Sequence, residues 1–132
     1  LTEPERERLA ELLLPAAGIV RLEGGNGAAW CDVYANSFGA LSAGTWYLVI
    51  TWHDAAANTV NICINNGTVD SSACASGVYD NASAFGMGAH SVDDPFYWDG
   101  RLDEVGFWKR VLTAAERTEL YNTGSGKTCC PF

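Results

Sequence analysis

Apolar and polar residues alternate most clearly between residues 45 and 65. Over 45–53 the apolar side chains recur with a period of two, which is typical of a half-buried β-strand. After a turn at 54–58, the same period returns over 59–65, where Val60, Ile62 and Ile64 share one face. Asn66-Gly67 can then supply the positive-φ residues of a tight hairpin turn. The pattern predicts two strands and a turn into a weaker strand and loop over 68–84.

Weaker strand patterns lie on both sides of this region. Residues 18–25 and 28–41 are separated by a Gly-rich turn, and the second run has apolar residues on both parities, so both of its faces can be covered. Residues 85–88 read as a short buried strand. In 96–107 the apolar parity changes between Leu102 and Val105, which predicts a β-bulge at Asp103-Glu104. The expected core is Trp46, Leu48, Ile50, Val60, Ile62, Ile64, Leu102, Val105 and Phe107.

Two segments carry helix signals. Residues 2–14 begin with a capping-box pattern and end before Pro15, and residues 114–121 are preceded by Thr113, with Glu116 three residues later and Gly124 as a helix-ending residue. Both starts share Leu-Thr-x-x-Glu-Arg-x-x-Leu. This echo favours residues 1–16 as an N-terminal helix left from a preceding unit of an array, followed by one domain over 17–132.

The charge is distributed unevenly. Between Arg21 and Arg101 there are eight acidic residues and no Lys or Arg, and the formal net charge is −8. Such a surface repels phosphate backbones and anionic lipids, so neither nucleic acid nor a membrane is an expected partner. It suits a hard cation, a neutral sugar or a basic partner. No apolar run is long enough to span a membrane.

Five Cys in 132 residues favour an oxidising, extracellular setting. Cys63 with Cys74 is the first expected disulfide because the two flank the turn at Asn66-Gly67, and Cys31 with Cys129 or Cys130 is the second. Two N-x-[ST] triplets make Asn66 and Asn81 candidate glycosylation acceptors.

From about Gly44 to Gly126 the chain resembles the laminin-G-like and pentraxin-like branch of the concanavalin A-like lectin/glucanase superfamily. The pieces that carry the resemblance are Gly44-Thr45-Trp46 before an alternating strand, Val60-x-Ile62-x-Ile64-Asn65-Asn66-Gly67, Met87-Gly88, Gly100-Arg101-Leu102-Asp103-Glu104-Val105, and Leu112-Thr113-x-x-Glu116 with Leu120-Tyr121-Asn122. The fold implied is all-β: an antiparallel, two-sheet jelly-roll sandwich. Here its opening strands are lacking, and short N-terminal and C-terminal helices are added.

The resemblance also bears on metals and catalysis. Some members hold Ca²⁺ at the sandwich rim, so calcium is a candidate cofactor, with Asp54, Asp93, Asp94 and Asp99 as candidate ligands. Glucanases of this superfamily carry alternating acids on one strand. Asp103 and Glu104 are adjacent instead, so we interpret them as architectural and expect no catalysis.

An aromatic pair beside carboxylates is suited to binding a sugar. Tyr97 and Trp98 follow Asp93-Asp94-Pro95. The two aromatic rings and the two carboxylates form the candidate ligand site, although Trp98 also has the parity of a packing residue. We therefore expect a non-catalytic, extracellular recognition or adhesion module that binds a glycan or an extracellular protein. The alternative is a structural component of a surface, fibre or virion, in which neighbouring chains donate strands or form a homo-oligomer.

Overall fold

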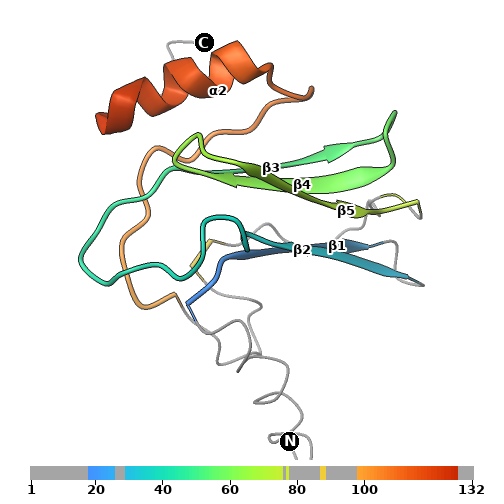
Figure 1. Cartoon of the computed structure of the whole chain (residues 1–132), viewed down its shortest axis with the longest axis horizontal. Coiled ribbons are helices and arrows are strands. Elements are labelled where there is room, and N and C mark those ends of the chain that lie inside the picture. Colours follow the sequence, from blue (N-terminus) through green and yellow to red (C-terminus); the bar gives the residue numbers. More distant parts are fainter. Residues whose placement is uncertain (1–17, 26–28, 76, 78–86, 89–97, 128–132) are drawn as a thin grey trace, which may run out of the picture.

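The structure is a computed structural model that describes residues 18–25, 29–75, 77, 87–88 and 98–127. It is mostly β, with two antiparallel sheets and a short C-terminal helix (Figure 1). The expected helix at 2–14 and the proposed boundary at residue 17 lie outside the described residues.

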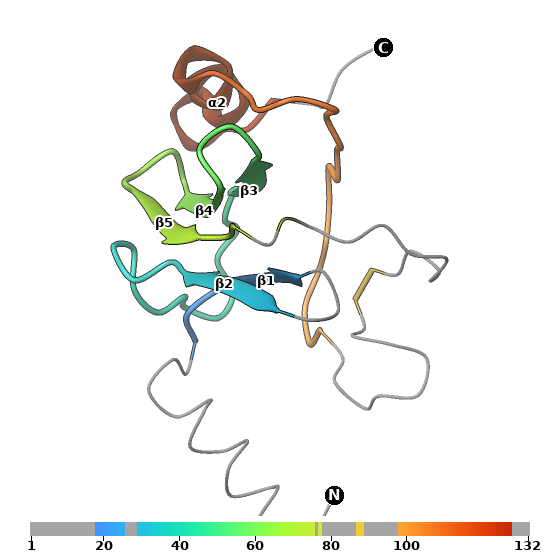
Figure 2. The same cartoon turned by 90° about the vertical axis from the view of Figure 1, so that its right-hand side faces the viewer.

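The two sheets face each other as layers. Strands β1 (Arg21–Gly25) and β2 (Trp30–Tyr34) form one sheet, and β3 (Val49–Asp54), β4 (Thr59–Ile64) and β5 (Val69–Ala73) form the other, in the order β3-β4-β5. Helix α2 (Ala114–Tyr121) lies beyond the three-stranded sheet, on the side away from β1 and β2, and a 3-10 turn, η2 (Asn122–Gly124), follows it (Figure 2).

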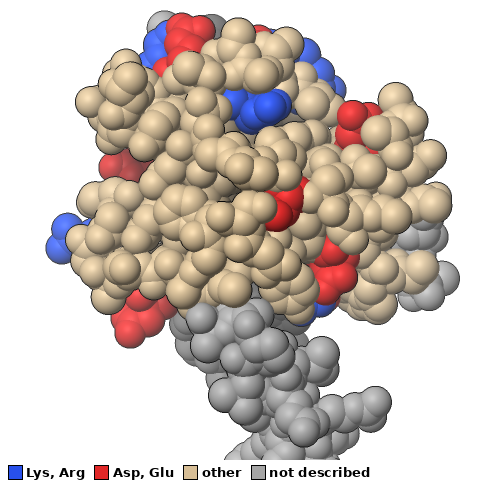
Figure 3. Space-filling model, in the orientation of Figure 1, with Lys and Arg blue, Asp and Glu red and all other residues tan. Residues whose placement is uncertain are grey.

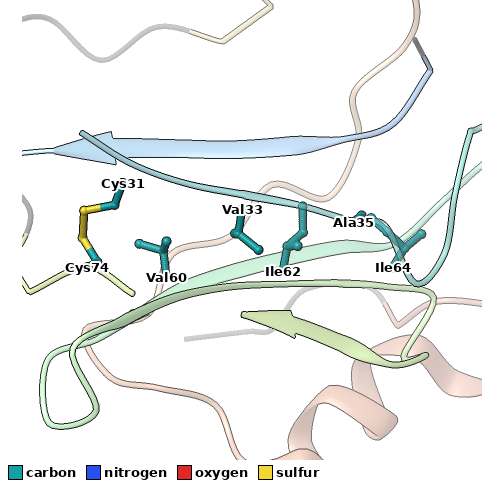
Figure 4. Close-up of a cluster of buried hydrophobic side chains, with 7 residues drawn as sticks. All are labelled: Cys31, Val33, Ala35, Val60, Ile62, Ile64 and Cys74. Carbon is teal, nitrogen blue, oxygen red and sulfur yellow. A yellow bond between two sulfur atoms is a disulfide. The ribbon is translucent and has the colours of Figure 1, made fainter. Parts of the chain in front are cut away.

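The core lies between β2 and β4. Figure 4 shows side chains from the two strands pointing toward one another across the space between the sheets. The buried cluster consists of Cys31, Val33, Ala35, Val60, Ile62, Ile64 and Cys74. The core face expected for β4 is confirmed, because Val60, Ile62 and Ile64 are all buried in this cluster. Asn61 and Cys63, on the other parity, are buried too, so both faces of β4 are covered. By contrast, only one parity of β2 is buried, and Trp30 on the other parity is exposed.

The hairpin turn after β4 is one residue earlier than predicted. Asn65 and Asn66 carry the positive φ values, 50° and 54°, and the Gly67 N–H donates to the Ile64 carbonyl at 2.9 Å. Asn tolerates the left-handed region because its short polar side chain can bond locally, so Gly is not required there. The earlier turn places Cys63 opposite Val69.

The apolar parity of β3 faces the helix instead of the core. Ile50 pairs with Cys63 and Trp52 with Asn61, whereas the core residues of β4 have the other parity. Directly paired residues share a face of the sheet. Ile50 and Trp52 therefore lie on the α2 side, where the Arg117 guanidinium stands 4.7 Å from the centre of the Trp52 ring. Leu48 is half-buried and Trp46 is exposed. The prediction that Trp46, Leu48 and Ile50 belong to the core is therefore wrong.

The predicted strand at 96–107 is absent from the residues described there, which start at Trp98. Leu102, Val105 and Phe107 are exposed, and so is Met87 of the expected strand at 85–88. The predicted β-bulge at Asp103-Glu104 is therefore wrong, because these residues belong to no strand. Glu104 instead has a left-handed backbone, with φ 51°, and its N–H donates to Asp103 Oδ1 at 2.9 Å. An alternating pattern shows only that a segment could form a half-buried strand. The segment becomes a strand only where a neighbouring strand pairs with it.

Helix α2 begins as predicted. Thr113 Oγ1 accepts from the Glu116 N–H at 3.2 Å, and Glu116 Oε2 accepts from the Thr113 N–H at 2.8 Å. Arg110 also binds the Glu116 carboxylate, and chiefly for this reason the pKa of Glu116 is lowered from 4.5 to about 2. The helix ends at Asn122, with φ 46°, whose N–H donates to the Thr118 carbonyl, so Gly124 is not the residue that ends it.

The cap leads to a first prediction. Thr113→Ala removes one acceptor of the capping box, and we expect the free energy of unfolding to fall by about 0.5–2 kcal/mol. Urea unfolding followed by far-UV circular dichroism would measure this change. Thr123→Ala is a suitable control, because Thr123 lies beyond the helix and its hydroxyl bonds only a local carbonyl. Equal losses in the two variants would contradict a specific role for the cap.

Candidate functional site on the outer face of the β1–β2 hairpin

Of the aromatic site expected at 93–98, the structure describes only Trp98. Asp93, Asp94 and Tyr97 lie outside the described residues. Trp98 is exposed, and its indole lies against Gly100, where an added Cβ would stand 2.7 Å from Nε1. Trp98 is therefore a surface aromatic and not the packing residue that its parity allowed.

Of the four expected calcium ligands, the structure describes Asp54 and Asp99, and Asp93 and Asp94 lie outside the described residues. Asp54 Oδ1 accepts from the N–H groups of Ala56 and Ala57, both at 3.0 Å, so this carboxylate closes the β3–β4 turn. Asp99 is exposed. Within the described part of the chain, no group of three or more His, Cys, Asp or Glu side chains is placed to hold a metal ion. Calcium binding stays a prediction that depends on Asp93 and Asp94.

The disulfide joins different residues from those expected. Cys31 and Cys74 are bonded, with their Cα atoms 5.3 Å apart, while Cys63 is a free, buried thiol whose pKa is raised, mainly by burial. Cys63 pairs with Ile50 on the α2 side of the sheet, and Cys74 lies in the core. Opposite facing thus excludes the pair Cys63–Cys74. Because Cys31 is bonded to Cys74, the alternatives with Cys129 and Cys130 are also wrong.

The structure describes only one of the two candidate glycosylation acceptors. Asn66 lies in the β4–β5 turn, and its Nδ2 donates to Thr118 Oγ1 of α2 at 3.0 Å. Asn81 lies outside the described residues. Glycosylation at either position stays a prediction.

The outer face of the β1–β2 hairpin brings together a set of side chains that the sequence did not single out. In the register of the hairpin, Arg21 is opposite Tyr34 and Glu23 is opposite Asp32. Since Cys31 and Val33 point into the core, residues of the other parity point outward. We call Arg21, Glu23, Trp30, Asp32 and Tyr34 the hairpin face.

Arg21 organises the hairpin face. Its Nη2 atom lies 2.7 Å from Glu23 Oε2 and 3.1 Å from Asp32 Oδ2, and its guanidinium stands 5.3 Å from the centre of the Tyr34 ring. All three charged side chains are more than one-third exposed, so the ion pairs add little stability. The ion pairs instead fix the positions of the two carboxylates, because one guanidinium holds both side by side at the surface.

Trp30 completes the face at the far end of β2. Its side chain is 73% exposed, the largest fraction among the exposed large hydrophobic residues described. Trp30 and Tyr34 are four residues apart on one strand, which corresponds to about 13 Å. The face therefore offers a bare aromatic surface, fixed hydrogen-bond acceptors and a second, partly covered ring in a row.

Comparison with known proteins places the chain in a family. A laminin G family model, described as Concanavalin A-like lectin/glucanases superfamily, matches residues 10–116. The chain belongs to this superfamily. No curated protein and no solved structure matches it.

Membership of the Concanavalin A-like lectin/glucanases superfamily confirms the resemblance and indicates a carbohydrate- or protein-binding module. The match also includes the β1–β2 hairpin, which lies before the motifs that carried the resemblance. The two-sheet architecture agrees with a sandwich of this superfamily. No described helix is both long and apolar enough to cross a bilayer.

The hairpin face could have been predicted from the sequence. Trp30 and Tyr34 already shared a parity there, but apolar residues on both parities suggested that both faces would be covered. The informative signal was the acid on the same parity, Asp32, between two aromatics on one short strand. A strand with a charged residue at its centre keeps that face toward water.

Proposed function

We propose that the protein is a non-catalytic, extracellular recognition or adhesion module that binds glycans through the hairpin face. The observation that carries this proposal is the exposed Trp30 ring on the same face as two carboxylates held by Arg21. The superfamily match supports a binding module in general, and the hairpin face supports a sugar as its ligand.

A sugar ring has two kinds of surface, and the hairpin face offers a partner for each. The C–H groups on one side of a pyranose pack on an aromatic ring, which loses little conformational entropy because Trp has only two side-chain torsions. The hydroxyl groups donate to carboxylates, and such charge-assisted bonds are stronger than neutral ones. Glu23 and Asp32 are pre-positioned by Arg21, so less ordering is needed on binding.

The ligand we propose is neutral. The face of the molecule in Figure 3 is largely uncharged, with acidic and basic side chains scattered over it and no broad basic patch. With a net charge of −8, the chain repels polyanions such as sulfated glycans. The buried Cys31–Cys74 bond supports an oxidising, extracellular setting.

Two pairs of carboxylates bear on the proposal that the protein is not an enzyme. At Asp103-Glu104, the Asp103 carboxylate accepts the N–H of a residue with a left-handed backbone, which is an architectural role. At Glu23 and Asp32, the Arg21 guanidinium bonds both carboxylates. A glycosidase needs its two carboxyl groups on either side of the scissile bond. Here the space between them is taken by Arg21.

A second prediction follows from the exposed ring. Trp30→Ala should weaken binding to a neutral oligosaccharide by about 5- to 150-fold, if the stacked sugar ring contributes the ~1–3 kcal/mol found for a base stacked on an aromatic side chain. A panel of neutral oligosaccharides on the intact chain, followed by calorimetry of the best binder, measures the change. Trp46→Ala is the matched control, because Trp46 is also an exposed Trp, at 61%, and lies outside the hairpin.

The same assay separates the alternatives. Binding that is lost with Trp98→Ala but kept with Trp30→Ala would move the site to the aromatic stretch at 93–98. Equal losses with Trp30→Ala and Trp46→Ala would contradict a defined site. Absence of binding to every neutral oligosaccharide, with tight binding to an extracellular protein, would replace the glycan by a protein ligand.

A further inference from the structure

On the hairpin face, the neighbours of Trp30 lie along the hairpin and not across it. In the register of the hairpin, the residue opposite Trp30 on β1 is Gly25, which has no side chain. The next outward-facing pair along the hairpin is Glu23 with Asp32. Outward-facing residues on one strand follow each other at about 7 Å. A sugar stacked on Trp30 therefore has its next protein contacts one step along β2.

The middle of the hairpin face has open hydrogen-bond acceptors. Arg21 Nη2 lies against Glu23 Oε2 and Asp32 Oδ2. Within the described part of the chain, nothing bonds the other oxygen of either carboxylate, Glu23 Oε1 or Asp32 Oδ1. The two side chains are 40% and 42% exposed, so these oxygens are accessible to hydroxyl groups of a ligand. A second sugar, linked to the one on Trp30, has acceptors for its own hydroxyl groups here.

The far end of the hairpin face offers a hydroxyl group. The Arg21 guanidinium stands 5.3 Å from the centre of the Tyr34 ring, so this ring is less open to stacking than that of Trp30. Among the described residues, the buried polar side-chain atoms without a hydrogen-bond partner are His53 Nε2 and Arg117 Nε. The Tyr34 hydroxyl, which no described residue bonds, is not one of them and therefore reaches solvent. It can both donate and accept a hydrogen bond.

We propose that the ligand of the hairpin face is a linear, neutral oligosaccharide that lies along β2. This inference rests on the proposed function and adds the length and the direction of the ligand. Trp30 and Tyr34 are separated by about 13 Å along the strand, a distance that one pyranose ring does not bridge and that about three linked sugars in an extended chain match. The first sugar stacks on Trp30, the second lies over the two carboxylates, and the third meets the Tyr34 hydroxyl.

A series of chain lengths tests this inference. Glucose, xylose, mannose and N-acetylglucosamine are each titrated into the intact chain as the monosaccharide and as linear β-1,4-linked oligomers up to the hexasaccharide, and binding is followed by NMR and calorimetry. For a series that binds, Kd should fall by about tenfold or more from the monosaccharide to the trisaccharide, because contacts to the carboxylates and to the Tyr34 hydroxyl are added. Longer oligomers should bind little more tightly than the trisaccharide.

Tyr34→Phe removes only the hydroxyl at the far end and keeps the ring that Arg21 covers. It should weaken trisaccharide binding by about 2- to 12-fold, the effect of one hydrogen bond, and leave monosaccharide binding unchanged. Trp30→Ala should weaken binding at every chain length. Tyr47→Phe is the matched control, because the Tyr47 hydroxyl accepts from the Ser42 N–H outside the hairpin, and it should change neither affinity.

Three results overturn this inference and leave the proposed function standing. The first is equal affinity for the monosaccharide and the trisaccharide, with both weakened by Trp30→Ala. The second is an affinity that rises with length and is unchanged in Tyr34→Phe, which places the chain in another direction. The third is binding of branched neutral oligosaccharides alone. Binding that Trp30→Ala leaves intact, or no binding of any neutral saccharide, overturns the proposed function and this inference with it.

Discussion

Replacing both Cys31 and Cys74 by Ala should lower the free energy of unfolding by about 4 kcal/mol. The two residues are 43 positions apart in the sequence, and a bond that closes a loop of this length removes much of the freedom of the unfolded chain. The bond also links β2 to the end of β5, and so ties the two sheets together at one end of the core (Figure 4). A small domain with one thin core depends strongly on such a link.

Urea unfolding with and without a reductant measures this effect. Reduction should destabilise the parent chain by about the same amount as the double substitution and should leave the double variant unchanged. Cys63→Ala is the control, because Cys63 is buried but not bonded, so its variant should keep the full response to reduction. A parent chain that unfolds identically with and without reductant would contradict the cross-link.

The elements that the sequence predicted well are those whose signals are local. Strand β4 combines a clean period of two with β-branched residues, and each feature favours a strand without reference to the rest of the chain. The cap of α2 is also local, because Thr113 and Glu116 satisfy each other's backbone N–H groups within one turn. Local consistency of this kind survives in any tertiary context.

The predictions that were wrong depended on facing and register. The alternation in β3 showed that one face is apolar, but a sheet covered by a helix on one side and a second sheet on the other can use either face. A shift of one residue in the turn after β4 changed the partner of Cys63. Because the facing of Cys63 was unknown, the proximity of Cys63 and Cys74 in sequence favoured a pair that the fold keeps apart.

The combination of side chains that the sequence pointed to at 93–98 also occurs at a second place in the fold. A surface aromatic beside carboxylates was expected in the loop at 93–98, where only Trp98 is described and the expectation stays a prediction. The same combination is found on the hairpin face. What the sequence lacked was the pairing of β1 with β2, which brings Glu23 next to Asp32 and lets Arg21 bond both. Cross-strand neighbours are distant in sequence, so spacing along one strand cannot show them.

The final prediction tests the facing of the two apolar sets in the three-stranded sheet. Ile62→Ala should lower the free energy of unfolding by about 2–5 kcal/mol, because Ile62 is 0% exposed and packs between the sheets, where its removal leaves a cavity. Ile50→Ala should cost less, since Ile50 is only half-buried beneath α2. Urea unfolding of both variants against the parent gives the comparison. A larger loss for Ile50→Ala would mean that the apolar face of β3, and not that of β4, fills the space between the two sheets.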